Sequence, residues 1–173
     1  ARAAASAAFL RAADIARKAG RKVALPLSDP FCVARHRARF RDLVANHVDV
    51  IFANEAELKS LYQMENFDAA LAAVRAETHI AAVTRSEKGA VIVSGEQSVA
   101  VPADPVEKLV DTTGAGDLFA AGFLLGLARG ASLETCGRLG VMAAAEVISH
   151  VGARPLVSLA ELARKRAIAI PAA

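Results

Sequence analysis

The sequence is poor in aromatic residues and in cysteine. Its 173 residues include no Trp, one Tyr and seven Phe. A core must therefore be built mainly from Ala, Leu, Val and Ile, which favours helices packed in layers on a sheet. The two cysteines, Cys32 and Cys136, lie far apart and belong to no metal-ligand motif. A disulfide framework and a zinc site are therefore not expected.

Long hydrophobic runs are also missing. A membrane-spanning helix needs about 18 or more consecutive apolar residues, and the nearest run, residues 118–128, contains two glycines and ends at Arg129. The Ala-rich start lacks the Leu-rich centre of a signal peptide and continues into Arg11 and Asp14 at helical spacing. We therefore expect no membrane partner and a cytoplasmic location.

Charge is present without a strong excess of one sign. The formal net charge is +3, with 54% hydrophobic and 23% charged residues, which is typical of one globular domain. The densest basic stretch, residues 35–41, carries no nucleic-acid recognition motif and is expected to be the solvated side of a helix. No nucleic-acid partner is predicted.

Helical and strand patterns alternate along the chain, which predicts an α/β fold with a mainly parallel sheet and ligands at the carboxyl ends of its strands. The expected helices cover residues 2–19, 33–45, 54 onward, 67–75, 115–129, 132–150 and 158–167. A buried parallel strand is expected over 22–28, two further strands over 48–53 and 79–84, and an antiparallel hairpin over 90–94 and 98–102. Gly20, Gly130 and Gly152 are expected to close helices.

Residues 111–117, with the sequence Asp-Thr-Thr-Gly-Ala-Gly-Asp, place small residues at the start of a helix directly after a polar turn. The N–H groups of Gly114, Ala115 and Gly116 can point together at a phosphate there, with help from the helix dipole. Asp117, in the first turn, suits a base aimed at a hydroxyl. An ordinary helix start with a dipole-compensating Asp explains the same pattern. Walker A and dinucleotide-binding motifs do not fit, because no Gly-Lys-Ser/Thr follows and Phe119 replaces the third glycine.

Three stretches, in this order along the chain, resemble motifs of the ribokinase-like (PfkB) carbohydrate and nucleoside kinases. Residues 54–57 resemble the Asn-x-x-Glu motif, 84–89 the Thr-x-x-x-x-Gly nucleotide loop, and 111–123 the C-terminal signature. The segments 27–31, 48–57 and 150–155 look most like adenosine kinases. The resemblance implies a three-layer α/β/α fold and covers residues 9 to 165.

The same resemblance implies the roles of the site residues. Asp117 would accept the proton of the acceptor hydroxyl, and Gly114, Ala115 and Gly116 would form the anion hole for the phosphoryl group. In a loose phosphoryl-transfer transition state positioning matters more than strong deprotonation, so an ordinary Asp suffices. The residues expected to contact ATP are Asn54, Thr84, Ser86, Gly89, Gly116, Val141, Ala144 and Val147.

Two metal roles follow from the resemblance. Asn54 and Glu57 lie three residues apart at a helix start, so both face one side, where they would hold Mg²⁺ through its waters. Taken alone, the motif is better explained by an N-cap and a dipole-facing Glu, and the neighbouring motifs favour the metal role. Asp111 and Thr113 would take part in a loop that binds a monovalent cation, K⁺, in some family members.

The sequence departs from the family in length. Members are longer, because an N-terminal portion supplies the first strands, the glycine-rich substrate loop and a small β-sheet lid. By the resemblance, residues 1–173 are the C-terminal part of a single kinase domain, with the nucleotide site, anion hole and base. The N-terminal strands and lid are missing from it. Turnover by this part alone is therefore not expected. The sequence leaves open whether the full-length protein forms a homo-oligomer.

Three functions remain open. The favoured one is an ATP-dependent transfer of phosphate to the primary hydroxyl of a nucleoside, adenosine giving AMP, as in purine salvage. A sugar kinase of the ribose or fructose type is the second, because the residues that select the acceptor lie mostly in the absent portion. The third is a non-catalytic module that binds a nucleotide and associates through a sheet edge left exposed.

Overall fold

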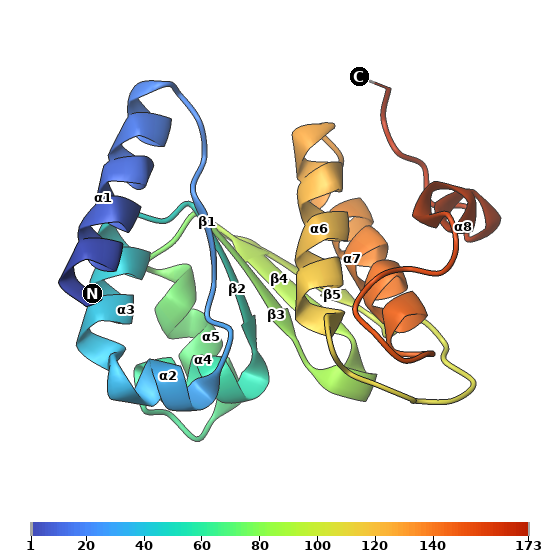
Figure 1. Ribbon diagram of the computed structural model, residues 1–173, viewed down its shortest axis with the longest axis horizontal. Coiled ribbons are helices and arrows are strands. Elements are labelled where there is room, and N and C mark those ends of the chain that lie inside the picture. Colours follow the sequence, from blue (N-terminus) through green and yellow to red (C-terminus); the bar gives the residue numbers. More distant parts are fainter. Residues whose placement is uncertain (1, 173) are drawn as a thin grey trace. The chain divides into compact units, whose positions relative to one another are not determined.

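The computed structural model describes the backbone of residues 2–172 and the side chains of residues 6–172. Over this range it contains a five-stranded sheet in the order β1-β2-β3-β4-β5 and eight α-helices (Figure 1). The chain divides into two compact units. The first unit holds the residues up to Ala81 together with Val93–Glu96, and the second holds Ala82–Ile92 and the residues from Gln97 onward.

Most predicted elements of the first unit are confirmed, because their apolar spacing and helix caps agree. Val50, Ile51, Leu58, Leu61 and Val74 are fully buried in its core. Its elements are α1 (Arg2–Lys18), β1 (Ala24–Pro26), α2 (Pro30–Arg35), α3 (Arg37–Asn46), β2 (Val50–Asn54), α4 (Glu55–Tyr62), α5 (Phe67–Arg75) and the start of β3 (Ile80–Thr84).

The prediction of a single helix over residues 33–45 is wrong. Two helices, α2 and α3, take its place, and the chain leaves helical geometry between them at His36 (φ −122°, ψ 26°). The first of them begins early because Asp29 accepts hydrogen bonds from the N–H groups of Phe31 and Cys32, while Pro30 occupies the first helical position. An Asp-Pro pair that ends a strand also has the chemistry that starts a helix.

The first strand differs from the prediction in burial. The segment 22–28 forms only the short strand β1, which pairs in parallel with β2 in the register Ala24↔Val50 and Pro26↔Phe52. Its residues are exposed or half-buried, whereas Val50 to Ala53 of β2 are buried. The prediction of a buried strand fails because β1 has a neighbour on one side only in this sheet.

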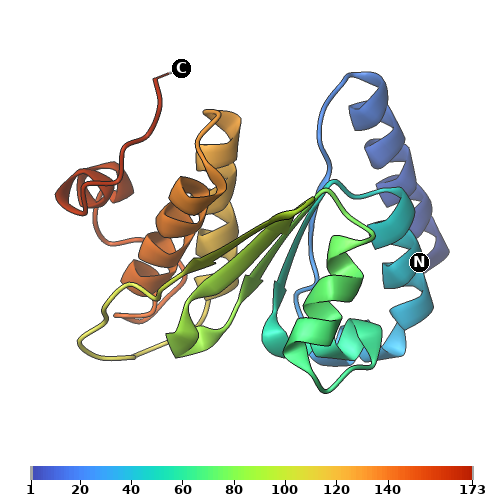
Figure 2. The same ribbon diagram turned by 180° about the vertical axis from the view of Figure 1, so that it is seen from behind.

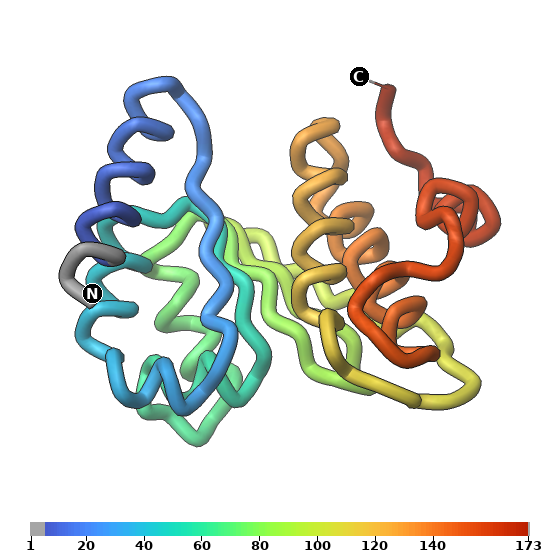
Figure 3. Tube along the Cα trace, viewed as in Figure 1, coloured from blue at the N-terminus to red at the C-terminus, as the bar shows by residue number. Residues whose placement is uncertain are grey.

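The second unit contains the rest of β3, the 3-10 helix η1 (Ser86–Lys88), the part of β4 (Ala90–Ser94) up to Ile92, β5 (Gln97–Val101), α6 (Ala115–Ala128), α7 (Leu133–Val147) and α8 (Leu159–Lys165). The predicted hairpin is confirmed, with a two-residue connection in which Gly95 has a positive φ of 52°. Figure 3 shows the long segment of residues 102–113, without helix or strand, that leads from β5 to the start of α6. A connection of this length usually carries function.

Helices α6 and α7 lie side by side at very close range (Figure 1). A Cβ atom added to Gly122 would lie 2.5 Å from the carbonyl oxygen of Leu139, and one added to Gly140 would lie 2.8 Å from the ring of Phe119. Backbone therefore touches backbone or ring at these points. Buried side chains on both sides of the contact, among them Phe123, complete the core of this unit.

The C-terminal end of α7 corrects one prediction. Gly152 does not close this helix, which ends five residues earlier at Val147. It has a φ of 99° and lies in the following loop, where its N–H group donates to Asp111. Gly20 and Gly130 do follow helices with positive φ, as predicted.

Candidate functional site

The turn before α6 has the backbone geometry of an anion-binding turn. Gly114 is the N-cap in the left-handed region, with φ 83° and no side-chain cap. Among the described residues, the N–H groups of Gly114, Gly116 and Asp117 have no hydrogen-bond partner, whereas Ala115 donates to the carbonyl of Thr112 at 3.2 Å. Two of the three predicted amides are thus available here, and the amide of Asp117, which was not predicted, joins them. Unpaired N–H groups at a helix start favour an anion.

The two glycines of this turn, Gly114 and Gly116, differ in the space around them. A Cβ atom on Gly114 would lie 2.7 Å from the Cβ of Ala153, so glycine is required there both by φ and by space. A Cβ atom on Gly116 would meet nothing within 4 Å. Its side of the turn is therefore open to an approaching group.

Asp117 occupies the third position of α6, and its side chain is exposed. Its carboxylate makes no hydrogen bond or ion pair within the part of the chain that the structure describes. A carboxylate whose lone pairs are not used internally can accept a proton from an incoming hydroxyl. The helix dipole stabilises its charge in the meantime.

Asp111 braces the turn. One carboxylate oxygen accepts hydrogen bonds from Thr113 N (2.9 Å) and Thr113 Oγ1 (2.7 Å), and the other accepts from Gly152 N at 3.1 Å. These bonds, above all the one from the Thr113 hydroxyl, hold the pKa of Asp111 below its ordinary value of 3.8. The brace therefore persists through the neutral and mildly acidic range, and is lost only as pH falls through the lowered pKa.

A loop from Ile148 to Val157 forms the other wall of the turn. Its position depends on Glu146, which sequence reasoning missed. One carboxylate oxygen of Glu146 accepts the N–H of Leu156 at 2.8 Å and lies 3.3 Å from Nε2 of His150. Its position in the last turn of a helix could have indicated a role, because the helix dipole disfavours an acidic residue there unless another interaction stabilises it.

The predicted nucleotide loop lies at the same end of the second unit as the start of α6, as both views in Figures 1 and 2 show. Thr84 ends β3 and is half-buried, Ser86 is exposed with φ 52°, and Gly89 is buried with φ 81°. A Cβ atom on Gly89 would lie 2.0 Å from the carbonyl oxygen of Val101. Glycine is thus needed there for the packing of β5, whatever the loop binds.

The residues of α7 that were expected to contact ATP are only partly accessible. Val141 and Ala144 are half-buried and offer some surface, whereas Val147 is fully buried. Its side chain belongs to the core of this unit and presents nothing to a ligand in this structure.

Asn54 and Glu57, in the first unit, form a reciprocal capping box. Glu57 N donates to Asn54 Oδ1 at 2.8 Å, while the two carboxylate oxygens of Glu57 accept from Asn54 N and Asn54 Nδ2, both at 2.9 Å. Burial raises the pKa of Glu57, which is only 6% exposed. The ionised carboxylate is therefore disfavoured by folding, and its stability contribution falls as pH rises from 4.5 through the raised pKa.

This capping box does not fit direct coordination of a metal ion. Both carboxylate oxygens of Glu57 are already engaged by Asn54, and the described chain contains no group of three or more His, Cys, Asp or Glu side chains placed for a metal. Contact through metal-bound waters remains compatible with it, because each oxygen keeps a second lone pair.

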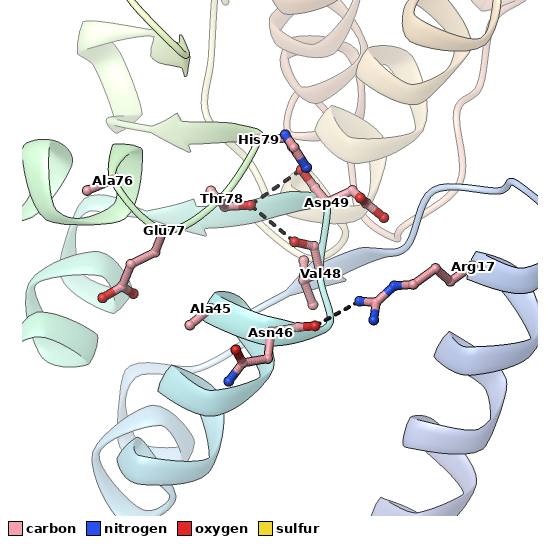
Figure 4. A pocket seen from close by; sticks show the side chains of 9 residues that line it. All are labelled: Arg17, Ala45, Asn46, Val48, Asp49, Ala76, Glu77, Thr78 and His79. Carbon is pink, nitrogen blue, oxygen red and sulfur yellow. Dashed lines mark hydrogen bonds between the residues drawn. The ribbon is translucent and has the colours of Figure 1, made fainter.

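A cavity of about 390 Å³ lies elsewhere, in the first unit, at the residues that precede β2 and β3 (Figure 4). Several of its polar groups are used for folding: Thr78 donates to the carbonyls of Val48 and Asp49, the Asp49 carboxylate accepts Val23 N, and Arg17 donates to the carbonyl of Asn46. It lies at the amino ends of the strands, whereas the predicted site lies at carboxyl ends.

Comparison with solved structures confirms the predicted ribokinase-like α/β fold, and the similar structures include several kinases. A probable sugar kinase from Rhizobium etli is 49% identical with a TM-score of 0.92, over 94% of this chain and 49% of that one. The adenosine kinase of Sinorhizobium meliloti is 51% identical with a TM-score of 0.90, over 92% and 49%. The chain belongs to the pfkB family of carbohydrate kinases, whose model matches residues 2–159.

Among curated proteins, the cytidine kinase of Thermococcus kodakarensis is 38% identical over 121 residues, which is 68% of this chain and 43% of that protein. The chain thus spans about half the length of the relatives it matches. No helix in residues 2–172 is long and apolar enough to cross a membrane.

Proposed function

We propose that these residues are the nucleotide-binding and proton-accepting part of a kinase that transfers the γ-phosphoryl group of ATP to the primary hydroxyl of a nucleoside, with adenosine as the preferred acceptor. The observation that carries the proposal is the exposed, unpartnered carboxylate of Asp117 beside the unpaired amides of Gly114 and Gly116. Family membership supplies the class of reaction.

In the proposed reaction the acceptor oxygen forms a bond to the γ-phosphorus while the bond from that phosphorus to the bridging oxygen breaks, and ADP leaves. The proton of the acceptor hydroxyl passes to the carboxylate of Asp117. The amides at the start of α6 stabilise charge on the oxygens of the moving phosphoryl group. Because these amides are held by the helix and by Asp111, they need little rearrangement as charge develops.

The choice of adenosine is supported by the adenosine kinase of Sinorhizobium meliloti, at 51% identity. A sugar kinase is the second candidate, supported by the probable sugar kinase of Rhizobium etli at 49%. The third candidate, a nucleotide-binding module without turnover, is supported by the unpaired amides of Gly114 and Gly116, which can bind a phosphate group whether or not it is transferred.

Phosphate transfer from radiolabelled ATP distinguishes these candidates. The 173-residue chain, and the gene-encoded protein with any residues that precede Ala1, are each given Mg²⁺ with adenosine, ribose or fructose. We expect transfer to adenosine by the gene-encoded protein. Transfer to ribose or fructose alone would favour the sugar kinase, and ATP binding by calorimetry without transfer from either protein would favour the binding module.

We further propose that Asn54 and Glu57 order Mg²⁺ through its waters, since a buried carboxylate with a raised pKa gains from a nearby cation. ATP would contact Thr84, Ser86 and the exposed parts of Val141 and Ala144. A monovalent cation at Asp111 and Thr113 would have to use main-chain oxygens, because the side-chain oxygens of both residues are hydrogen-bonded to each other.

Replacing Gly116 by Val tests the anion hole. The added methyl groups enter space that is open in the structure, and Val has a slightly better helix propensity than Gly, so folding should be unaffected. They would crowd the phosphoryl group, and we expect kcat/KM for ATP to fall about 10²-fold. Steady-state kinetics and a thermal melt measure the two effects.

The matched control is Ala128→Val, which places the same Val side chain at the exposed far end of α6. Equal activity of the Gly116→Val variant and the control would contradict the anion-hole role of this turn.

A further inference from the structure

The loop from Ile148 to Val157 lacks an apolar anchor. None of its residues from Ser149 onward is buried, and its largest apolar side chains point to solvent, with Val151 80%, Leu156 73% and Val157 53% exposed. Burial of apolar surface therefore contributes little to its position. Hydrogen bonds must hold it in place.

Three hydrogen bonds spread along the loop attach it to the rest of the protein. The carbonyl of Ile148 accepts Val110 N at 2.9 Å at the start of the loop, Asp111 accepts Gly152 N in the middle, and Glu146 accepts Leu156 N near the end. Close to α7, the carbonyl of Glu146 also accepts Ser149 N and Ser149 Oγ, and its carboxylate lies 3.3 Å from His150 Nε2. Glu146 is thus the tie for the second half of the loop. It acts from α7, which is fixed by its close contact with α6.

The loop in turn shapes the start of α6. Ala153 lies between the ties at Gly152 and Leu156, and its Cβ occupies the space that a side chain on Gly114 would need, at 2.7 Å. Movement of the loop away from Glu146 would remove the wall against which the left-handed turn at Gly114 is packed. The amides of that turn would then lose their common direction.

Glu146 itself is costly to keep. Its side chain is 7% exposed, its second carboxylate oxygen is buried without a hydrogen-bond partner in the described chain, and it stands in the last turn of a helix, where the dipole disfavours negative charge. A group that costs stability in three ways and is tied to a loop amide has the signature of a functional constraint.

We propose that Glu146 is a positioning residue for the anion-binding turn: through the N–H of Leu156 it holds the loop 148–157, and through Ala153 that loop holds Gly114. The part that concerns catalysis rests on the proposed function. The claim that Glu146 holds the loop and the turn in place does not depend on that function, and it is tested separately.

The test is amide hydrogen exchange by NMR on the 173-residue chain in three forms, wild type, Glu146→Leu and Glu146→Gln. Leu removes the acceptor with little change in size, whereas Gln keeps a carbonyl oxygen for Leu156 N. We expect exchange to be about tenfold faster at Leu156, Gly152 and Thr113 in the Leu variant, and within about threefold of wild type in the Gln variant. Glu134→Leu, an exposed site on the same helix, is the matched control.

Amides in the centre of α7 provide the readout that a general stability role would change. They should keep their wild-type exchange in Glu146→Leu. Equal acceleration there, or unchanged exchange at Leu156 and Thr113, would overturn the proposal, and Glu146→Ala gives the same comparison if the Leu variant does not fold.

Kinetics then separate the two proposals. In the active gene-encoded protein, Glu146→Leu should lower kcat by about tenfold or more while Glu146→Gln retains most of it. Accelerated exchange in a protein without kinase activity would sink the proposed function and leave the positioning role standing. Normal exchange in an active kinase would do the reverse.

Discussion

Replacing Asp117 by Asn is expected to lower kcat by about 10²- to 10⁴-fold, with the KM for ATP changed by less than about threefold. Asn has the shape of Asp but cannot accept the proton of the acceptor hydroxyl. The side chain is exposed and makes no internal hydrogen bond or ion pair in the described chain, so the loss should fall on the chemical step rather than on folding. Steady-state kinetics on the gene-encoded protein with adenosine and ATP measure it.

Asp68→Asn is the control for this experiment. Asp68 is an exposed aspartate in the first turn of another helix, α5, so its replacement removes the same charge from the same kind of position. Both variants should lose about 0.3–1 kcal/mol of dipole stabilisation at most. A kcat for Asp117→Asn equal to that of Asp68→Asn would exclude Asp117 as the base.

Replacing Gly122 by Val should lower the free energy of unfolding by about 3 kcal/mol. The Cβ atom alone would lie 2.5 Å from the backbone oxygen of Leu139, and backbone cannot move aside as a flexible side chain can. For a chain of this size the midpoint of thermal unfolding should fall by roughly 6–12 °C. A thermal melt followed by circular dichroism measures it.

Ala121→Val, at the exposed neighbouring position of the same helix, separates close packing from helix propensity. Val costs less than about 1 kcal/mol there. If both variants melted at the same temperature, the close contact of α6 with α7 would not contribute to stability as the geometry requires.

Elements with strong local signals were predictable from sequence. The helix at 67–75 was predicted with its observed bounds, and Asn54 was recognised as a helix cap because Asn with Glu three residues later is a capping pattern. The hairpin followed from two β-rich runs separated by Gly95 and its neighbours. Each of these depends on residues close together in the chain.

Features that depend on distant residues were not predictable. Nothing near β1 indicates that it has one neighbouring strand, and nothing near Gly152 shows that its amide is needed by Asp111, 41 residues away. For the site, the glycine-rich pattern indicated the turn, yet the loss of the Ala115 amide to Thr112 and the role of Glu146 required the folded backbone.

The glycine contacts between α6 and α7 have a further consequence. Where two helices are separated by a layer of side chains, rotamer changes let one slide against the other, but backbone in contact with backbone has no such compliance. The first turn of α6 is therefore attached to a rigid support. The direction of its N–H groups should change little with the charge of the group beside them. In the proposed reaction, such a support would lower the reorganisation energy of phosphoryl transfer, because the amide dipoles are already oriented in the folded protein and need not turn as charge develops.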